Sequence, residues 1–177
     1  MTGPTYKDAL TRGNIALAAN DRTRFIGYGL MKGRALGTLK EVAATQIIEA
    51  PVAENLMMGL AIGLALKGYR PVVFIERMDF ILNALDAIVN HLDKAKPLSR
   101  GEFSPAVVIR TVVGNKEKPL YTGITHTQDF AEAVSHMVSF PVFQLKTPAE
   151  VTTAYQQAES NLVTGISTIL VEYKDLV

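Results

Sequence analysis

Glu54 is the residue whose type and position are best suited to acid–base chemistry. It lies in the first turn of a helix expected to begin near Pro51, directly before the apolar stretch Asn55 to Leu66. A carboxylate in such surroundings is desolvated and can share a proton with a ligand nitrogen, as many general acids and bases do. The alternative is a carboxylate that complements the helix dipole and caps free N–H groups of its own helix. Position alone does not decide between these two roles.

Phe80 and His126 are the other candidates. Phe80 follows a strand expected over 70–75 and opens the next helix, so we expect it at the same end of the sheet as Glu54. An aromatic side chain at such a boundary usually packs in the core, and a stacking role requires a flat ligand. His126 lies in Thr125-His126-Thr127-Gln128, at the end of a long polar connection. Loop histidines are often only structural, but loops at the carboxyl ends of strands frequently carry function.

Other familiar signals are weak or missing. His91 and His136 fall inside helical patterns with no second ligand at metal spacing, so we predict no metal held by this chain. The sequence has no Gly-x-x-x-x-Gly-Lys-Ser/Thr, no Gly-x-Gly-x-x-Gly after a strand and no Gly-x-Ser-x-Gly. Gly27-Tyr28-Gly29 follows a strand but lacks the third glycine of a dinucleotide-binding loop.

Composition narrows the class of protein. The chain has 177 residues, 48% of them hydrophobic, a net charge of +1 and no cysteine. These values predict a single soluble domain over 1–177 in a reducing cytoplasm, with no disulfides and no nucleic-acid or membrane partner. No signal peptide is apparent, and the apolar stretch 55–66 is shorter than the ~20 residues of a membrane span.

The elements that must position the candidates alternate between strand and helix. Strands are expected at 24–27, 46–49, 70–75, 105–113, 140–146 and 168–173. Helices are expected at 6–19, 51–67 and 148–159, and another is expected near Asp129. A further helix is expected to begin at an Asp79 cap and to run through Leu92. Residues 28–39 are expected to form a loop. This order predicts an α/β fold, a three-layer, mostly parallel sheet with helices on both faces and ligands beyond the carboxyl ends of the strands.

Several motifs together resemble a known family. The first is Ala50-Pro51-Val52-Ala53-Glu54 with the small and apolar helix through Gly59 and Gly63. The others are Gly68-Tyr69-Arg70-Pro71, Phe80 with Ala84-Leu85-Asp86-Ala87-Ile88-Val89-Asn90, and Thr125-His126-Thr127-Gln128. In this order they resemble the pyrimidine-binding domain of transketolase-like thiamine diphosphate enzymes, most of all the beta subunit of pyruvate and branched-chain 2-oxo acid dehydrogenases.

The resemblance implies a role for each candidate. Glu54 matches the family's catalytic glutamate, which hydrogen-bonds N1′ of the aminopyrimidine and favours the tautomer that removes the thiazolium C2 proton. Phe80 matches the aromatic residue that stacks on the pyrimidine. His126 matches a histidine near the thiazolium that contacts substrate. The cofactor is therefore expected to be thiamine diphosphate, with the carbon chemistry done by the cofactor itself.

The resemblance also implies a partner. The family's Gly-Asp-Gly motif and downstream Asn, which hold Mg²⁺ and the diphosphate, are absent from this sequence. We therefore expect a diphosphate-binding alpha-type subunit to supply them in a heterotetramer, and this chain to be inactive alone. The family's further C-terminal domain, which helps bind an acyltransferase core, has no counterpart before Val177, which leaves docking to such a core open.

The expected function is a subunit of a split enzyme that cleaves or forms a C–C bond next to a carbonyl. The beta-subunit motifs favour 2-oxo acid decarboxylation with acyl transfer, and ketol transfer from a ketose, as in transketolase, is the alternative. A noncatalytic regulatory or scaffolding subunit on the same fold is a second alternative. A third is an unrelated α/β ligand-binding domain in which Glu54 only caps its helix. The sequence does not specify the substrate, the acceptor or the subunit stoichiometry.

Overall fold

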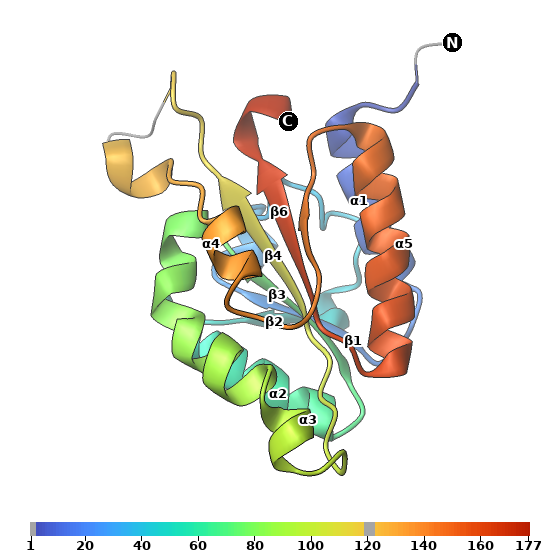
Figure 1. Ribbon diagram of the computed structural model, residues 1–177. Coiled ribbons are helices and arrows are strands. Elements are labelled where there is room, and N and C mark those ends of the chain that lie inside the picture. Colours follow the sequence, from blue (N-terminus) through green and yellow to red (C-terminus); the bar gives the residue numbers. More distant parts are fainter. Residues whose placement is uncertain (1–2, 119–122) are drawn as a thin grey trace.

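Six strands form one sheet in the order β2-β1-β3-β4-β6-β5, and each neighbouring pair is parallel (Figure 1). The computed structural model describes residues 3–118 and 123–177. The strands are β1 (Thr23–Gly27), β2 (Ile47–Glu49), β3 (Arg70–Ile75), β4 (Val108–Val113), β5 (Val142–Gln144) and β6 (Thr168–Tyr173). The prediction of a parallel α/β sheet is confirmed. The two edge strands are shorter than expected, and β4 begins at Val108 rather than at 105.

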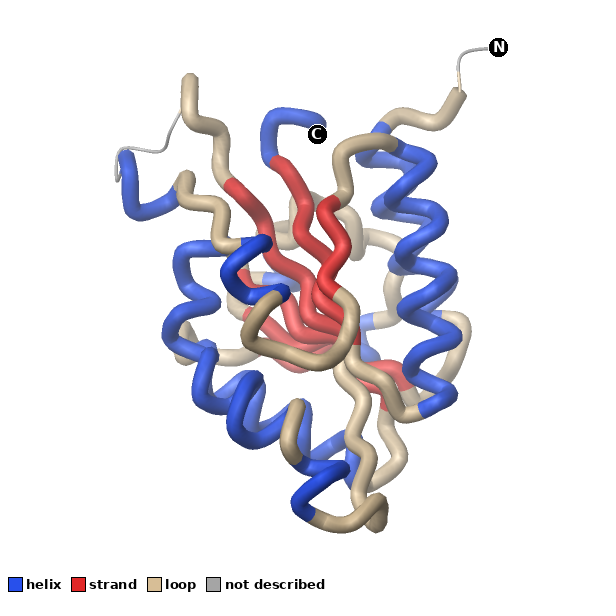
Figure 2. Tube along the Cα trace, viewed as in Figure 1, coloured by secondary structure: helices blue, strands red, loops and turns tan. Residues whose placement is uncertain are grey.

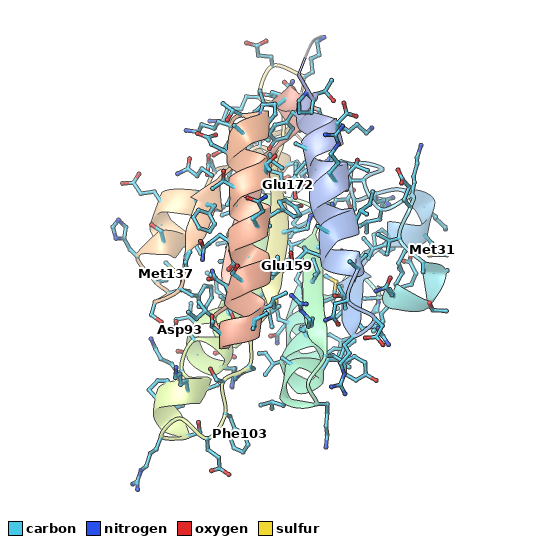
Figure 3. All side chains as sticks on the ribbon, turned by 90° about the vertical axis from the view of Figure 1, so that its right-hand side faces the viewer. Met31, Asp93, Phe103, Met137, Glu159 and Glu172 are labelled. Carbon is cyan, nitrogen blue, oxygen red and sulfur yellow. The ribbon has the colours of Figure 1, made fainter. Side chains whose placement is uncertain are left out.

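Helices cover both faces of the sheet and make three layers (Figure 2). Helices α1 (Tyr6–Ala18) and α5 (Pro148–Thr164) lie side by side on one face (Figure 3). Helices α2 (Glu54–Leu66), α3 (Ala95–Leu98) and α4 (Ala131–Ser135) lie on the other side of the molecule (Figure 1). Successive strand residues point to opposite faces, so each strand supplies both cores. The first core contains Phe25, Phe74 and Val108, and the second contains Ile26, Val73 and Ile109.

The two helices of the first layer have strong start signals. Thr5 and Asp8 form a reciprocal capping box at α1, and Thr147 and Glu150 form another at α5. Each box satisfies N–H groups that have no partner within the helix. Helix α5 continues beyond the expected 159 to Thr164 and is capped by Gly165, whose left-handed backbone favours glycine.

The segment after β3 differs from the expected single helix. It consists of a 3₁₀ helix η3 (Met78–Ala84), a π-helix η4 (Asp86–Leu92) and the short α3, which the sequence did not predict. Ile81 and Ile88 are buried as their spacing predicted. The expectation that Asp79 caps this segment is wrong, because Arg77 precedes the first turn and the Asp79 carboxylate bonds to Gln128 instead.

Some other boundaries shift. Helix α2 begins at Glu54 rather than near Pro51, because the backbone of Ala53 is not helical (φ −157°, ψ 83°), and α4 begins at Ala131. The loop 28–39 contains one 3₁₀ turn, η1 (Leu30–Lys32), and two further turns are η2 (Ala44–Gln46) and η6 (Lys174–Leu176). Residues 119–122 of the expected long connection lie outside the described residues. Across the described ranges, no helix has both the length and the apolar character needed to cross a membrane.

A buried ion pair joins the sheet to the first helical layer. Arg110 on β4 donates from Nε to Oε1 of Glu172 at 2.7 Å and from Nη2 to Oε2 at 3.1 Å. The hydroxyl of Tyr155 on α5 also donates to Glu172, and Arg110 reaches Thr38 in the loop after β1. Burial disfavours the charged form of Arg110, but the adjacent Glu172 carboxylate outweighs this and raises the pKa of Arg110 above its ordinary value.

Candidate functional site

The three predicted residues lie where the chain leaves three parallel strands. Glu54 is the first residue of α2, after β2, and Phe80 lies in η3, after β3. His126 ends the 3₁₀ turn η5 (Gly123–His126), after β4. Parallel strands end at the same edge of the sheet, so these connections converge there, and Figure 1 shows the turn near residue 125 beside the upper end of the green helical segment that begins with η3. Contacts of α2 with η3, and of η3 with η5, link the three segments.

Glu54 is buried at this edge, with 6% of the residue exposed. Nδ2 of Asn83 on η3 donates to its Oε2 over a long 3.4 Å. Among the hydrogen bonds of the described residues, the Glu54 carboxylate is therefore oriented by η3 and not by the N–H groups of its own helix. This arrangement favours the acid–base role over the capping role, because a weakly held buried carboxylate retains acceptor capacity for a ligand.

Phe80 and His126 contact each other directly. Their ring centroids are 5.0 Å apart and their planes make an angle of 87°, an edge-to-face arrangement. Both residues are half-buried, so each keeps part of its surface open to solvent. Phe80 is thus not a fully packed core residue, and an aromatic ring and an imidazole meet at an accessible part of the sheet edge.

Asp79 and Gln128 are site-forming residues that the candidate list lacked. Asp79 is only 8% exposed, and its Oδ1 accepts a hydrogen bond from Nε2 of Gln128 at 2.8 Å. Each is a close neighbour of a candidate, since Asp79 precedes Phe80 and Gln128 comes two residues after His126. Gln128 belongs to the Thr125-His126-Thr127-Gln128 motif, but the sequence does not show that it pairs with a residue forty-nine positions away.

Gly114 also shapes the site, at the first position after β4. A Cβ placed on Gly114 would overlap the carbonyl oxygen of His126 and approach that residue's carbonyl carbon to 3.1 Å. The backbone of His126 therefore passes directly over the end of β4, where only glycine fits without a shift.

A second loop borders the same edge. The Glu49 carboxylate, at the end of β2, accepts hydrogen bonds from the backbone N–H of Gly29 at 2.9 Å and from that of Met31. Arg34 forms an ion pair with Glu76, just after β3, at 3.0 Å. These bonds fix the segment after β1 beside the segments that carry Glu54 and Phe80.

The two weaker histidine candidates lie apart from these contacts. His91 is exposed on η4, 3.3 Å from Asp86, and His136 is exposed after α4. The part of the chain that the structure describes contains no group of three or more His, Asp or Glu side chains placed to hold a metal ion.

Comparison with known proteins gives matches in sequence and in fold. The chain is 32% identical over 123 residues to the pyruvate dehydrogenase E1 component subunit beta of Leifsonia xyli, covering 69% of this chain and 35% of that protein. It is 33% identical over 100 residues to the 3-methyl-2-oxobutanoate dehydrogenase subunit beta of Mycobacterium tuberculosis, covering 54% of this chain and 29% of that protein. The chain thus spans about a third of the length of these relatives. No model of a protein family matches it.

Among solved structures, one described as "Split gene transketolase, inactive beta4 tetramer" matches with a TM-score of 0.74 and 16% identity. The match covers 98% of this chain and 52% of that chain, so the shared fold includes all six strands. The sequence similarity and the fold agree with the resemblance drawn from the motifs: this chain is a homologue of the beta subunits of 2-oxo acid dehydrogenases and has a transketolase-like fold.

Proposed function

We propose that this chain is a single pyrimidine-binding domain that serves as one subunit of a split thiamine diphosphate enzyme. The observation that carries the proposal is the position of Glu54. It is a buried carboxylate at the carboxyl edge of a parallel sheet, held by Asn83 from the same 3₁₀ helix that presents Phe80 to His126. The similarity to beta subunits supports the proposal and argues against an unrelated ligand-binding domain.

The described residues fit one half of the cofactor. Glu54 offers an acceptor to a protonated ring nitrogen, Phe80 offers an accessible aromatic surface to a flat ring, and His126 adds a polar group beside it. In this proposal the other half, the diphosphate with Mg²⁺, is held by the partner subunit, because this sequence lacks the Gly-Asp-Gly motif with which the family binds it.

In this proposal each residue has a defined task. Thiamine diphosphate, when bound, supplies a carbon nucleophile that attacks a carbonyl and stabilises the carbanion left by C–C cleavage. Glu54 holds a proton at a ring nitrogen of the cofactor, and its burial strengthens that hydrogen bond by excluding water. Phe80 orients the ring by stacking. His126 contacts the substrate and donates or accepts a proton there.

A partner of alpha type completes the site by holding the diphosphate and Mg²⁺, and the assembly is a heterotetramer. The substrate class is a 2-oxo acid that undergoes decarboxylation with acyl transfer, in line with the named activities of the sequence relatives. Ketol transfer is the second candidate, favoured by the structural match to a split transketolase.

The test is reconstitution with the candidate partner. The chain is co-expressed with products of adjacent genes, and thiamine diphosphate with Mg²⁺ is titrated calorimetrically into the chain alone and into the pair. We expect binding by the pair only, and turnover with either 2-oxo acids or ketose phosphates will distinguish the two reaction types. Absence of binding in every pairing would contradict the proposal and favour a scaffolding subunit.

Within an active pair, Glu54→Gln tests the catalytic assignment. It removes the carboxylate and keeps the shape, so we expect loss of turnover by at least about 100-fold, the usual scale of proton-transfer catalysis, with the fold retained by circular dichroism. Glu132→Gln is the matched control, because Glu132 is an exposed glutamate in the first turn of α4. Turnover by Glu54→Gln equal to that of the control would refute the role of Glu54.

A further inference from the structure

We propose that Asp79 and Gln128 are positioning residues that fix the His126 ring against Phe80. This inference rests on the proposed function for its catalytic meaning, but the contacts that carry it belong to this chain alone. Asp79 and Phe80 are consecutive residues of η3, and Gln128 lies two residues beyond His126. One hydrogen bond between Asp79 and Gln128 therefore ties the segments that carry the two rings.

The hydrogen bond between Gln128 and Asp79 is short, and its acceptor, Asp79, is a buried residue. Nε2 of Gln128 is 2.8 Å from Oδ1 of Asp79, and the backbone N–H of Gln128 approaches the same oxygen at 3.4 Å. Only 8% of the surface of Asp79 is exposed, whereas Gln128 is an exposed residue. The fixed partner is thus Asp79, because it is buried on η3, the helix that contributes Met78 and Ile81 to the second core. The loop residue is the one being held.

His126 needs such a restraint because the hydrogen-bond partner of its ring is local: Oγ1 of Thr125, its neighbour in the same 3₁₀ turn, lies 3.2 Å from Nδ1 and moves with that turn. His126 is half-buried and shares an edge-to-face contact with Phe80. Its backbone passes over Gly114, which allows close approach but exerts no hold, since glycine has no side chain to pack. On the far side of Gln128, Asp129 accepts a hydrogen bond from the hydroxyl of Tyr173 on β6 at 2.9 Å. The segment is thus tied to η3 on one side and to β6 on the other.

The second carboxylate oxygen of Asp79, Oδ2, also supports a positioning role for this residue. Oδ2 is buried and has no hydrogen-bond partner among the described residues. A buried acceptor without a partner is unfavourable, so the carboxylate is not at this position to stabilise the fold. Asparagine keeps the acceptor oxygen that Gln128 uses and removes the charge. The hydrogen bond between residue 79 and Gln128, which we call the clamp, should therefore be kept in Asp79→Asn and lost in Asp79→Ala.

The test uses the full chain without cofactor. The chain has three histidines, and His91 and His136 are exposed, so the ring C–H signals of His126 can be assigned by His126→Gln and followed by NMR against two internal references. Phe80→Leu calibrates the effect of the neighbouring aromatic ring. We expect Asp79→Ala and Gln128→Leu to move the His126 signal in the same direction as Phe80→Leu, and Asp79→Asn to leave it near the wild-type position.

Two outcomes would overturn the proposal. One is an unchanged His126 signal in both Asp79→Ala and Gln128→Leu, and the other is no response to Phe80→Leu, which would show that the rings do not meet in solution. Gln128 is exposed, so Gln128→Leu keeps the test valid if Asp79→Ala does not fold. Asp21→Asn is the control, because Asp21 is an exposed aspartate just before β1, at the opposite edge of the sheet from His126, and it leaves the surroundings of the two reference histidines unchanged.

The effect of Gln128→Leu on kcat tests the positioning role separately from the proposed function. In an active pair, Gln128→Leu should lower kcat at least tenfold and leave cofactor affinity within twofold, because the Glu54 and Phe80 positions are unchanged. Unchanged kcat would contradict the positioning role. If no pairing is active, the proposed function fails, whereas the NMR result for the clamp stands or falls independently.

Discussion

At the residue scale, Gly114 shows that the site depends on a position with no side chain. The carbonyl group of His126 occupies the space where a Cβ of Gly114 would lie. Gly114, the first residue after β4, is therefore in direct backbone contact with His126. A methyl group there must displace either the end of β4 or the backbone of His126. Because β4 lies inside the sheet between β3 and β6, the His126 segment is the part that moves.

Gly114→Ala is therefore expected to destabilise the chain and to shift His126. Overpacking of this kind costs about 1–3 kcal/mol of unfolding free energy. Urea denaturation of the isolated chain measures this loss, and the NMR signal of His126 reports the displacement. A variant with wild-type stability and an unmoved His126 signal would show that the two backbones are not in contact.

At the element scale, glycines in two helices should respond in opposite ways to the same change. In α1, a Cβ on Gly13 would overlap the ring of Tyr155, which cannot swing away because its hydroxyl is bonded to Glu172. In α2, Gly59 is exposed and a Cβ there would meet nothing within 4 Å. We expect Gly13→Ala to lower the unfolding free energy by about 1 kcal/mol or more. Gly59→Ala should raise it by about 0.5–1 kcal/mol through helix propensity.

Chemical denaturation of both variants under identical conditions checks this pair. A stabilising Gly13→Ala would mean that α1 and α5 can separate without loss. Destabilisation by Gly59→Ala in the isolated chain would mean that the outer side of α2 is packed against something within the monomer.

The elements also show what sequence could and could not predict. Apolar periodicity and β-branched runs were sufficient for the strands and for helices α1, α2 and α5, because each has a continuous buried face. Periodicity could not distinguish an α-helix from the 3₁₀ and π turns after β3, since Ile81 and Ile88 are buried in either form. The Asp79–Gln128 bond and the Gly114–His126 contact join separate connections, and only the folded sheet brings them together. The residue types were visible, whereas their pairing was not.

At the scale of the whole molecule, the Arg110–Glu172 pair joins parts that are far apart in the sequence. It links β4 to β6 directly, α5 through Tyr155, and the loop after β1 through Thr38. Both charged side chains are fully buried. A buried charge that loses its partner is strongly unfavourable, whereas replacing both partners with apolar groups is much less so.

We therefore expect Glu172→Leu to lower the unfolding free energy by about 3–5 kcal/mol. The double variant Arg110→Met with Glu172→Leu should lose less than the sum of the two single changes, because neither charge is left without a partner. A double-mutant cycle by urea denaturation measures this coupling. Strictly additive losses would show that Glu172 does not interact with Arg110 in solution.

The position of β6 inside the sheet has a consequence for biosynthesis. Of these six strands, β6 is made after the other five, yet it lies between β4 and β5 and its backbone pairs with both. Until the ribosome releases this segment, the backbone edge of β4 that pairs with β6 is open, and Arg110 lacks its carboxylate partner. Such an edge can pair with other nascent chains, so the interval before β6 emerges is when a chaperone would protect this protein most.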